Sequence, residues 1–267
     1  METMKIVLIH GWASDHTVWL HVKDALKELG HLDVCCIDLP GYGARANETY
    51  TSQEALSELV EMASAEPCVL VGWSLGGLLA LHAFQDALAN PAAKVVAIAA
   101  LPQFVQSEFG QIGMPSTVFD AFVKGYCKNQ SACIKRFIAL QSTKAEVTVD
   151  ATISKRRITA RDDMTPSRAR ALVLDAVMSD QTPRFSFESG LNSLTALREL
   201  TIESKQLNRR CHFILGENDS IVSVADGCQI ARDSSACVSV ISGATHLLPL
   251  THASQIAAGI VGGISQQ

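Results

Sequence analysis

The segment Val69–Gly77 reads Val-Leu-Val-Gly-Trp-Ser-Leu-Gly-Gly, and it constrains the fold more than any other stretch of the chain. Its apolar, β-branched start predicts a buried strand, and the leucines and alanines that follow predict a helix. A serine between glycines at a sharp strand-to-helix turn is typical of a nucleophile elbow, because side chains at Gly72 or Gly76 would collide with the neighbouring strand and helix. The alternative is a tight turn whose small residues serve packing alone. We predict that Ser74 is a catalytic nucleophile.

Strands and helices alternate on both sides of this elbow. Apolar runs predict strands at residues 6–9, 34–39, 68–71, 94–100, 211–215 and 237–241, and a last helix spans about 253–264. This alternation predicts an α/β protein with a mostly parallel central sheet and helices on both faces. The chain has 267 residues and is 48% hydrophobic, so it can bury a large core.

The alternation stops between residues 104 and 208. This segment is expected to be helical, with helices at about 117–126, 131–140 and 166–178 and a basic stretch around 155–161. We therefore expect three parts: a first core segment at 1–103, a helical lid at 104–208 and a second core segment at 209–267. The lid would roof a pocket and control what reaches Ser74.

Two further candidates follow the late strands. Asp219 comes after the strand at 211–215, and His246 comes after the strand at 237–241. The carboxyl ends of parallel strands meet at one edge of a sheet, so these residues are expected near Ser74. The order Ser, Asp, His is that of α/β-hydrolases. In that arrangement Asp219 orients His246, which takes the proton from Ser74.

The loop His10-Gly11-Trp12 follows the first predicted strand. In a serine hydrolase such a loop lies beside the elbow, and its backbone N–H supplies part of the oxyanion hole. We expect the backbone N–H groups of Trp12 and Leu75 to hold the oxyanion. His10 is expected to shape this loop, while the Trp12 side chain is either core or pocket wall.

Three other residues compete for the acid and base roles. Glu217 lies two positions before Asp219, and His252 lies six positions after His246. We favour Asp219 because it lies further into its loop, and His246 because it follows Gly-Ala-Thr outside the last helix. Asp38 lies in Asp-Leu-Pro-Gly-Tyr-Gly, where an aspartate typically stabilises a turn through its own backbone.

Composition excludes several classes of protein. The eight cysteines form no Cys-x-x-Cys pair, so neither a disulfide framework nor a zinc site is expected. No metal-binding or dinucleotide-binding motif is present, and we predict no metal and no cofactor. The apolar run at residues 6–9 is too short for a signal peptide or a membrane span. We expect a cytoplasmic monomer that binds neither membrane nor nucleic acid.

Charge is distributed unevenly along the chain. The formal net charge is −5, yet the segment from Lys124 to Arg170 carries eleven Lys and Arg against four acids, a balance of +7. A solvated helical face would explain this pattern. The alternative is a surface that attracts an anionic partner to the mouth of the pocket.

Four sequence blocks together resemble one family. These blocks are Leu8–Trp12, Asp38–Gly43, Gly72–Gly77 and Arg136–Gln141. They are similar to those of the pimeloyl-[acyl-carrier protein] methyl ester esterases of biotin synthesis. The first three blocks are shared broadly among α/β-hydrolases, whereas the block Arg-Phe-Ile-Ala-Leu-Gln in the expected lid is the most specific.

The resemblance implies hydrolysis of the methyl ester of a pimeloyl chain carried by acyl carrier protein. It implies that Ser74, Asp219 and His246 form the triad and that the substrate site is lined by Trp12, Leu75, Phe137, Ile138, Ala139, Leu140 and Gln141. It also implies that Arg136 meets the acidic carrier protein. The neighbouring basic residues Lys155, Arg156, Arg157 and Arg161 are further candidates for carrier docking.

Two other functions stay open from the sequence. The first is a general short-chain carboxylesterase or thioesterase of the same fold acting on small free substrates. The second is a hydrolase-like receptor that binds a ligand and barely turns it over. A carrier-dependent reaction should weaken as ionic strength rises, whereas turnover of a small neutral ester should barely change.

Overall fold

The computed structural model describes residues 4–88, 90–107, 112–143, 156–157, 164–179 and 182–265. Its centre is a parallel sheet in the order β2-β1-β3-β4-β8-β9-β5. The six longer strands are β1 (Lys5–Ile9), β2 (Val34–Ile37), β3 (Cys68–Trp73), β4 (Lys94–Ile98), β8 (Cys211–Gly216) and β9 (Cys237–Ile241). The predicted α/β class and parallel sheet are confirmed.

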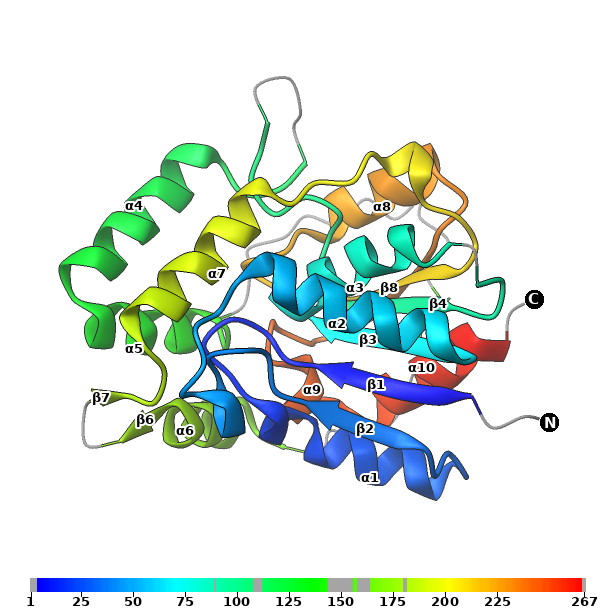
Figure 1. The fold of residues 1–267 in the computed structure, drawn as a ribbon, viewed down its shortest axis with the longest axis horizontal. Coiled ribbons are helices and arrows are strands. Elements are labelled where there is room, and N and C mark those ends of the chain that lie inside the picture. The colour runs from blue at the N-terminus through cyan, green and yellow to red at the C-terminus, as the bar shows by residue number, and fades with distance from the viewer. Residues whose placement is uncertain are drawn as a thin grey trace.

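Helices cover both faces of this sheet. Figure 1 shows α2 (Ser52–Ala65), α3 (Leu75–Asp86) and α8 (Val224–Asp233) on one face, and α1 (Leu20–Glu28), α9 (Leu248–Thr251) and α10 (Ala253–Ser265) on the other. The strands are buried because both faces are covered, and every residue of β3 and of β8 is buried. Within the described residues, no helix is long and apolar enough to cross a membrane.

The sequence predicted most of these elements. The observed β2 ends at Ile37 and β4 at Ile98, each two residues before the predicted end. Helices α8 and α9 were not predicted, nor was the helix observed at Phe187–Glu199. Side-chain caps begin several helices as their sequences suggest. Thr51 accepts a hydrogen bond from the N–H of Glu54, and Thr165 accepts one from the N–H of Arg168.

The segment between β4 and β8 carries four helices among its described residues. They are α4 (Ser116–Lys128), α5 (Gln130–Leu140), α6 (Pro166–Val177) and α7 (Phe187–Glu199), together with a short antiparallel pair, β6 (Met178–Ser179) and β7 (Thr182–Pro183). Figure 1 shows these helices gathered beyond the end of the sheet at which β1 ends. The inserted helices therefore lie over the carboxyl ends of the parallel strands.

One part of the basic stretch differs from the helix expected there. Arg156 and Arg157 form strand β5, which pairs in parallel with β9 through Ser239 and Val240. Without β5, β9 would be the edge strand of the sheet, and its backbone N–H and C=O groups on that side would lack partners in the sheet. Strand β5 pairs with these groups. The predicted helix around residues 155–161 is therefore wrong at these two positions, while Lys155 and Arg161 lie outside the described residues.

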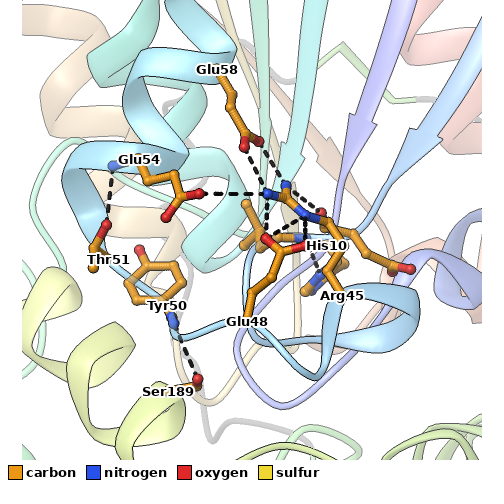
Figure 2. A network of polar contacts seen from close by, with 10 residues as sticks. His10, Arg45, Glu48, Tyr50, Thr51, Glu54, Glu58 and Ser189 are labelled. Carbon is orange, nitrogen blue, oxygen red and sulfur yellow. Dashed lines mark hydrogen bonds and ion pairs between the residues drawn. The ribbon is translucent and has the colours of Figure 1, made fainter.

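A polar network joins the core to the inserted helices. Figure 2 shows the guanidinium of Arg45 between the carboxylates of Glu48 and Glu58, at 2.6 Å and 2.7 Å. Nearby, the backbone N–H of Tyr50 donates a 3.1 Å hydrogen bond to Oγ of Ser189 on α7. This contact anchors α7 to the connection between β2 and α2, while the ion pairs of Arg45 hold that connection against α2.

Candidate active site

Ser74 lies at a strained turn between β3 and α3. Its backbone adopts φ 55° and ψ −116°, a left-handed conformation that L-residues rarely occupy. A Cβ at Gly72 would lie 2.1 Å from the carbonyl oxygen of Gly76, and a Cβ at Gly76 would lie 2.4 Å from that of Ile9. These contacts involve backbone atoms, so glycine is required at both positions. The turn predicted from the sequence is therefore present.

The loop after β1 lies against this elbow. The register of β1 and β3 pairs Ile9 with Gly72, which brings the following residues of both strands side by side. A Cβ at Gly11 would lie 3.2 Å from Cβ of Ser74. Ser74 is also followed directly by the first turn of α3, where the N–H groups of Gly77 and Leu78 donate to the carbonyl of Ser74 and those of Leu75 and Gly76 are not used by the ladder of the helix. Backbone donors from two segments therefore converge beside Ser74.

His10 holds the loop through both ring nitrogens. Its Nδ1–H donates to the carbonyl of Gly11 at 2.8 Å, and its Nε2 accepts from the N–H of Leu39 at 3.0 Å. The ring is fully buried, and this burial lowers the pKa of His10 below the usual 6.5. A neutral imidazole that bridges two backbone groups is a structural residue, in line with the loop-shaping role expected for it.

Asp219 and His246 form a buried pair. Nδ1–H of His246 donates to Oδ2 of Asp219 at 2.8 Å, and neither side chain is exposed. The other oxygen, Oδ1, accepts from the N–H groups of Ile221 and Val222 at 2.8 Å and 3.0 Å. These bonds fix the carboxylate, which in turn fixes the imidazole.

The register of the sheet explains why these two residues meet. Strands β8 and β9 end side by side, with Gly216 paired to Ile241. The loops that follow are joined by a 2.8 Å hydrogen bond from the N–H of Asn218 to the carbonyl of Ala244. Two residues 27 positions apart in the sequence are thereby brought into direct contact.

The competing acids have other partners. Oε2 of Glu217 accepts from Oγ–H of Ser242 and the N–H of Gly243, at 2.7 Å and 3.0 Å. Glu217 thus braces the loop that carries His246. Of Glu217 and Asp219, it is Asp219 that contacts His246.

Asp38 holds its loop through contacts more distant along the chain than the local turn bond expected from its sequence context. Its carboxylate accepts from the N–H groups of His16 and Ala44 and from the His16 ring. Burial alone would raise the pKa of Asp38, but these N–H donors hold it below the usual value.

The rival base His252 lies at the end of α9, where its Nδ1 is 2.8 Å from Oγ1 of Thr251. His246 is therefore the histidine that the fold pairs with Asp219.

The second ring nitrogen of His246 faces away from Asp219. This atom, Nε2, is buried and makes no hydrogen bond with any residue that the structure describes. Trp73, the residue before Ser74, lies against the same imidazole, with ring centroids 5.6 Å apart. The elbow and the Asp219–His246 pair are therefore neighbours at the carboxyl edge of the sheet.

Trp12 connects the loop after β1 to the inserted helices. The side chain is 1% exposed, and its Nε1–H donates to the carbonyl of Gly190 on α7 at 2.9 Å. Its ring also contacts four aromatic rings at centroid distances of 5.1–6.3 Å, namely those of Phe122, Tyr126, Phe137 and Phe185. The side chain of Trp12 is therefore the centre of an aromatic cluster between core and inserted helices.

The block 137–141 ends helix α5 beside the acid loop. Oγ–H of Ser220 donates to the carbonyl of Leu140 at 3.1 Å, which joins α5 to the residue after Asp219. Ile138 is buried, Ala139 is half-buried and Leu140 is 43% exposed. Gln141 is buried, and its Oε1 accepts no hydrogen bond from the described residues. A buried amide oxygen without a partner among the described residues, next to the acid loop, is suited to accept a hydrogen bond from a substrate.

The candidate carrier-docking residues do not share one helix. Arg136 lines a groove of about 390 Å³ between α4 and α5, whose other walls include Lys128, Cys133 and Phe137. Arg156 and Arg157 lie instead on β5 at the edge of the sheet. No role was predicted from the sequence for Lys128 or for Ser220, although Ser220 is adjacent to Asp219.

Metal ligands are not gathered in the described part of the chain. Among those residues, no group of three or more His, Cys, Asp or Glu side chains is arranged to hold a metal ion.

Comparison with known proteins agrees with this geometry. Residues 6–258 match the alpha/beta hydrolase family, and the chain belongs to that family. A pimeloyl-[acyl-carrier protein] methyl ester esterase from Xylella fastidiosa is 30% identical over 263 residues, covering 96% of this chain and 92% of the relative. The biotin biosynthesis bifunctional protein BioHC of Cellvibrio japonicus is 28% identical over 257 residues, or 96% of this chain, and the chain spans 46% of that longer protein.

Solved structures show the same fold. A bromoperoxidase from Bacillus anthracis aligns with a TM-score of 0.73 at 21% identity, covering 98% of this chain and 92% of that chain. The resemblance noted from the sequence blocks is confirmed by the curated relatives. The expected class of enzyme, a carboxylic ester hydrolase, is likewise confirmed.

Proposed function

We propose that the chain hydrolyses its ester through Ser74 as nucleophile, His246 as general base and Asp219 as the orienting acid. The observation that carries this proposal is the buried 2.8 Å contact between Asp219 and His246 beside a serine at a strained turn. The carboxylate fixes the imidazole tautomer with the proton on Nδ1, which leaves Nε2 as the basic atom. The free Nε2 of His246 is the atom that would accept the Ser74 proton.

The reaction then proceeds in two steps, acylation and deacylation of Ser74. Oγ of Ser74 attacks the ester carbonyl while its proton passes to Nε2 of His246, and the tetrahedral intermediate releases methanol, which takes that proton. Water next attacks the acyl-enzyme, again giving its proton to His246, and the free carboxylic acid leaves with Oγ–H of Ser74 restored. Backbone N–H groups of Leu75 and Trp12 would stabilise the oxyanion in both halves.

We propose the methyl ester of pimeloyl-[acyl-carrier protein] as the substrate, in a step of biotin synthesis in the cytoplasm. The names of the curated relatives support this choice, and two of them align with 80% and 96% of this chain. The described residues of the block 137–141 lie between the aromatic cluster and the acid loop, where the acyl chain would pass. We further propose that residues 104–208 act as the lid on a core formed by 1–103 and 209–267.

Docking of the acidic carrier protein is proposed at the basic surface of α4 and α5. Arg136 and Lys128 line one groove there, and the segment 124–170 carries an excess of positive charge. Long-range attraction of this kind speeds association and weakens as salt rises. Arg156 and Arg157 on β5 would form a second contact with the carrier. Lys155 and Arg161, which lie outside the described residues, are further candidates.

The experiment compares two substrates on purified protein. Methyl pimeloyl-carrier protein and a small neutral methyl ester are each incubated with wild type, Ser74→Ala and Arg136→Glu. Ser74→Ala should abolish turnover of both substrates. Arg136→Glu and added salt should slow only the carrier-bound substrate, mainly by raising KM.

A result that separates the alternatives comes from the same experiment. If the small ester is hydrolysed well and the carrier-bound ester is not, the triad stands and the chain is a general short-chain esterase. If Ser74→Ala keeps full activity, the proposed nucleophile is wrong. Growth of a biotin auxotroph lacking its own esterase, restored by wild type and not by Ser74→Ala, tests the pathway directly.

A further inference from the structure

The side chain of Trp73 contacts the loop that carries His246 in two ways. Its Nε1–H donates a 2.9 Å hydrogen bond to the backbone carbonyl of His246. Its ring also lies against the imidazole, with centroids 5.6 Å apart and planes inclined at 43°. Trp73 is fully buried, so both contacts are shielded from water.

The same ring contacts the loop after β1. A Cβ at Gly11 would lie 3.1 Å from Cε3 of Trp73, which means that the indole packs directly on this loop. Trp73 is the last residue of β3 and pairs with Ile98 on β4, so its backbone is held on a central strand. One rigid indole thus lies between the segment expected to bind the oxyanion and the segment that carries the base.

His246 needs such a support because its side chain is held at one end only. Nδ1 is bound to Asp219, while Nε2 makes no hydrogen bond with the described residues. A ring bound through a single atom can still tilt about that bond. A hydrogen bond to the backbone carbonyl of the same residue fixes the main chain from which the imidazole projects.

We propose that Trp73 is a positioning residue that sets the imidazole of His246 relative to Oγ of Ser74. This inference rests on the proposed roles of Ser74 and His246. Because Trp73 and Ser74 are consecutive residues, any movement of the elbow is transmitted through the indole to the loop of His246. The N–H and the ring of Trp73 maintain the distance and orientation between Ser74 and His246.

The consequence is a defect in chemistry with substrate binding intact. A displacement of about 1 Å between reacting groups lowers turnover by about 100-fold. Loss of the indole N–H should therefore lower kcat by about 10- to 100-fold. KM should stay within about twofold, because Trp73 is fully buried and acts through His246.

The test replaces Trp73 with benzothienylalanine, an isostere that carries sulfur in place of the indole N–H. The matched control is the same replacement at Trp19, which is equally buried and whose Nε1 makes no hydrogen bond with the described residues. Both proteins are assayed for kcat and KM on a small ester, for melting temperature, and for the rate at which a fluorophosphonate labels Ser74. Trp73→Phe serves as a second variant that also removes part of the ring.

The expected result is a fall in kcat and in the labelling rate by the same factor for the Trp73 isostere, with neither changed for the Trp19 isostere. If the Trp73 isostere keeps wild-type kcat and labelling, the inference is overturned and the indole N–H serves packing alone. Failure of the proposed function looks different: wild type itself would not be labelled at Ser74, or Ser74→Ala would remain active.

Discussion

The loops at the strand ends and the inserted helices are built in different ways. At the strand ends, backbone atoms set the geometry. Ser74 has a left-handed φ, a Cβ at Gly72 or Gly76 would lie only 2.1–2.4 Å from a backbone carbonyl oxygen, and N–H groups fix Asp219. In the inserted helices, side chains make the contacts, chiefly the aromatic rings around Trp12. The expected chemistry depends on a rigid backbone, and the expected substrate choice depends on side chains that can vary.

Exposure follows the same division. Ser74 and His246 are 3% and 0% exposed, whereas Val118 on α4 and Leu140 on α5 are 52% and 43% exposed. Apolar side chains left at the surface of one region are available to contact a substrate or partner. The inserted helices can therefore change their surface without disturbing the pair of Asp219 and His246. Four predictions test this contrast, beginning with the largest expected effect.

Asp219→Asn should leave the fold intact and lower kcat by about 10³- to 10⁴-fold, because the amide favours the wrong tautomer of His246. The matched control is Glu217→Gln, which removes a carboxylate two residues away that binds Ser242 and Gly243. We expect the control to keep kcat within about tenfold. Steady-state kinetics on a small ester measures both variants, and equal losses would contradict the assignment of the acid.

Gly76→Ala and Gly125→Ala should have opposite effects on stability. The new Cβ at Gly76 would meet the carbonyls of Ile9 and His10 at 2.4 Å and 2.5 Å, so we expect a loss of about 2–3 kcal/mol. Gly125, within α4, has nothing within 4 Å, so alanine should stabilise the helix by about 0.5–1 kcal/mol. Urea unfolding measures both values. A stable, active Gly76→Ala variant would show that the elbow is less rigid than the structure indicates.

Trp12→Phe should weaken the junction between core and inserted helices by about 1–3 kcal/mol. The change removes the hydrogen bond to Gly190 and part of a ring that contacts four aromatic neighbours. The Trp12 N–H expected in the oxyanion hole belongs to the backbone and is retained. We therefore expect a higher KM and faster proteolysis within α4 to α7, with a smaller change in kcat. Proteolysis at the same sites in Trp19→Phe gives the baseline for losing a buried indole.

His10→Gln should change how stability depends on pH. Burial lowers the folded-state pKa of His10, so the unfolded chain binds more protons between that value and 6.5. The stabilisation is complete above pH 6.5 and is lost as pH falls toward the folded pKa. Urea midpoints between pH 5 and 8 should fall less steeply for His10→Gln than for wild type. The exposed His21→Gln control should follow wild type, and an unchanged slope in His10→Gln would count against a buried neutral histidine.

Patterns among neighbouring residues were sufficient to predict the strands and the turn that the site depends on. The elbow at Ser74 and the strands before Asp219 and His246 could be predicted because each is encoded by neighbouring residues, with a glycine requirement or a continuous apolar run. The strand ends of a parallel sheet meet at one edge, so chain order alone brought these residues to the same place. The lid block was recognised by resemblance alone, since nothing in the periodicity of α5 distinguishes it.

The rest depends on contacts between residues far apart in the sequence. Arg156 and Arg157 pair with β9 about 80 positions away, a register that no local pattern encodes. Trp12 and Trp73 find their hydrogen-bond acceptors 178 and 173 positions away. Glu217 and Asp219 are two residues apart in one loop. The sequence favoured Asp219 by its place in that loop, and the folded position of His246 shows which of the two it contacts. The sequence determined which side chains could carry the chemistry. The tertiary structure decided their partners, because a hydrogen bond forms only between groups that lie close in space, whatever their separation in the sequence.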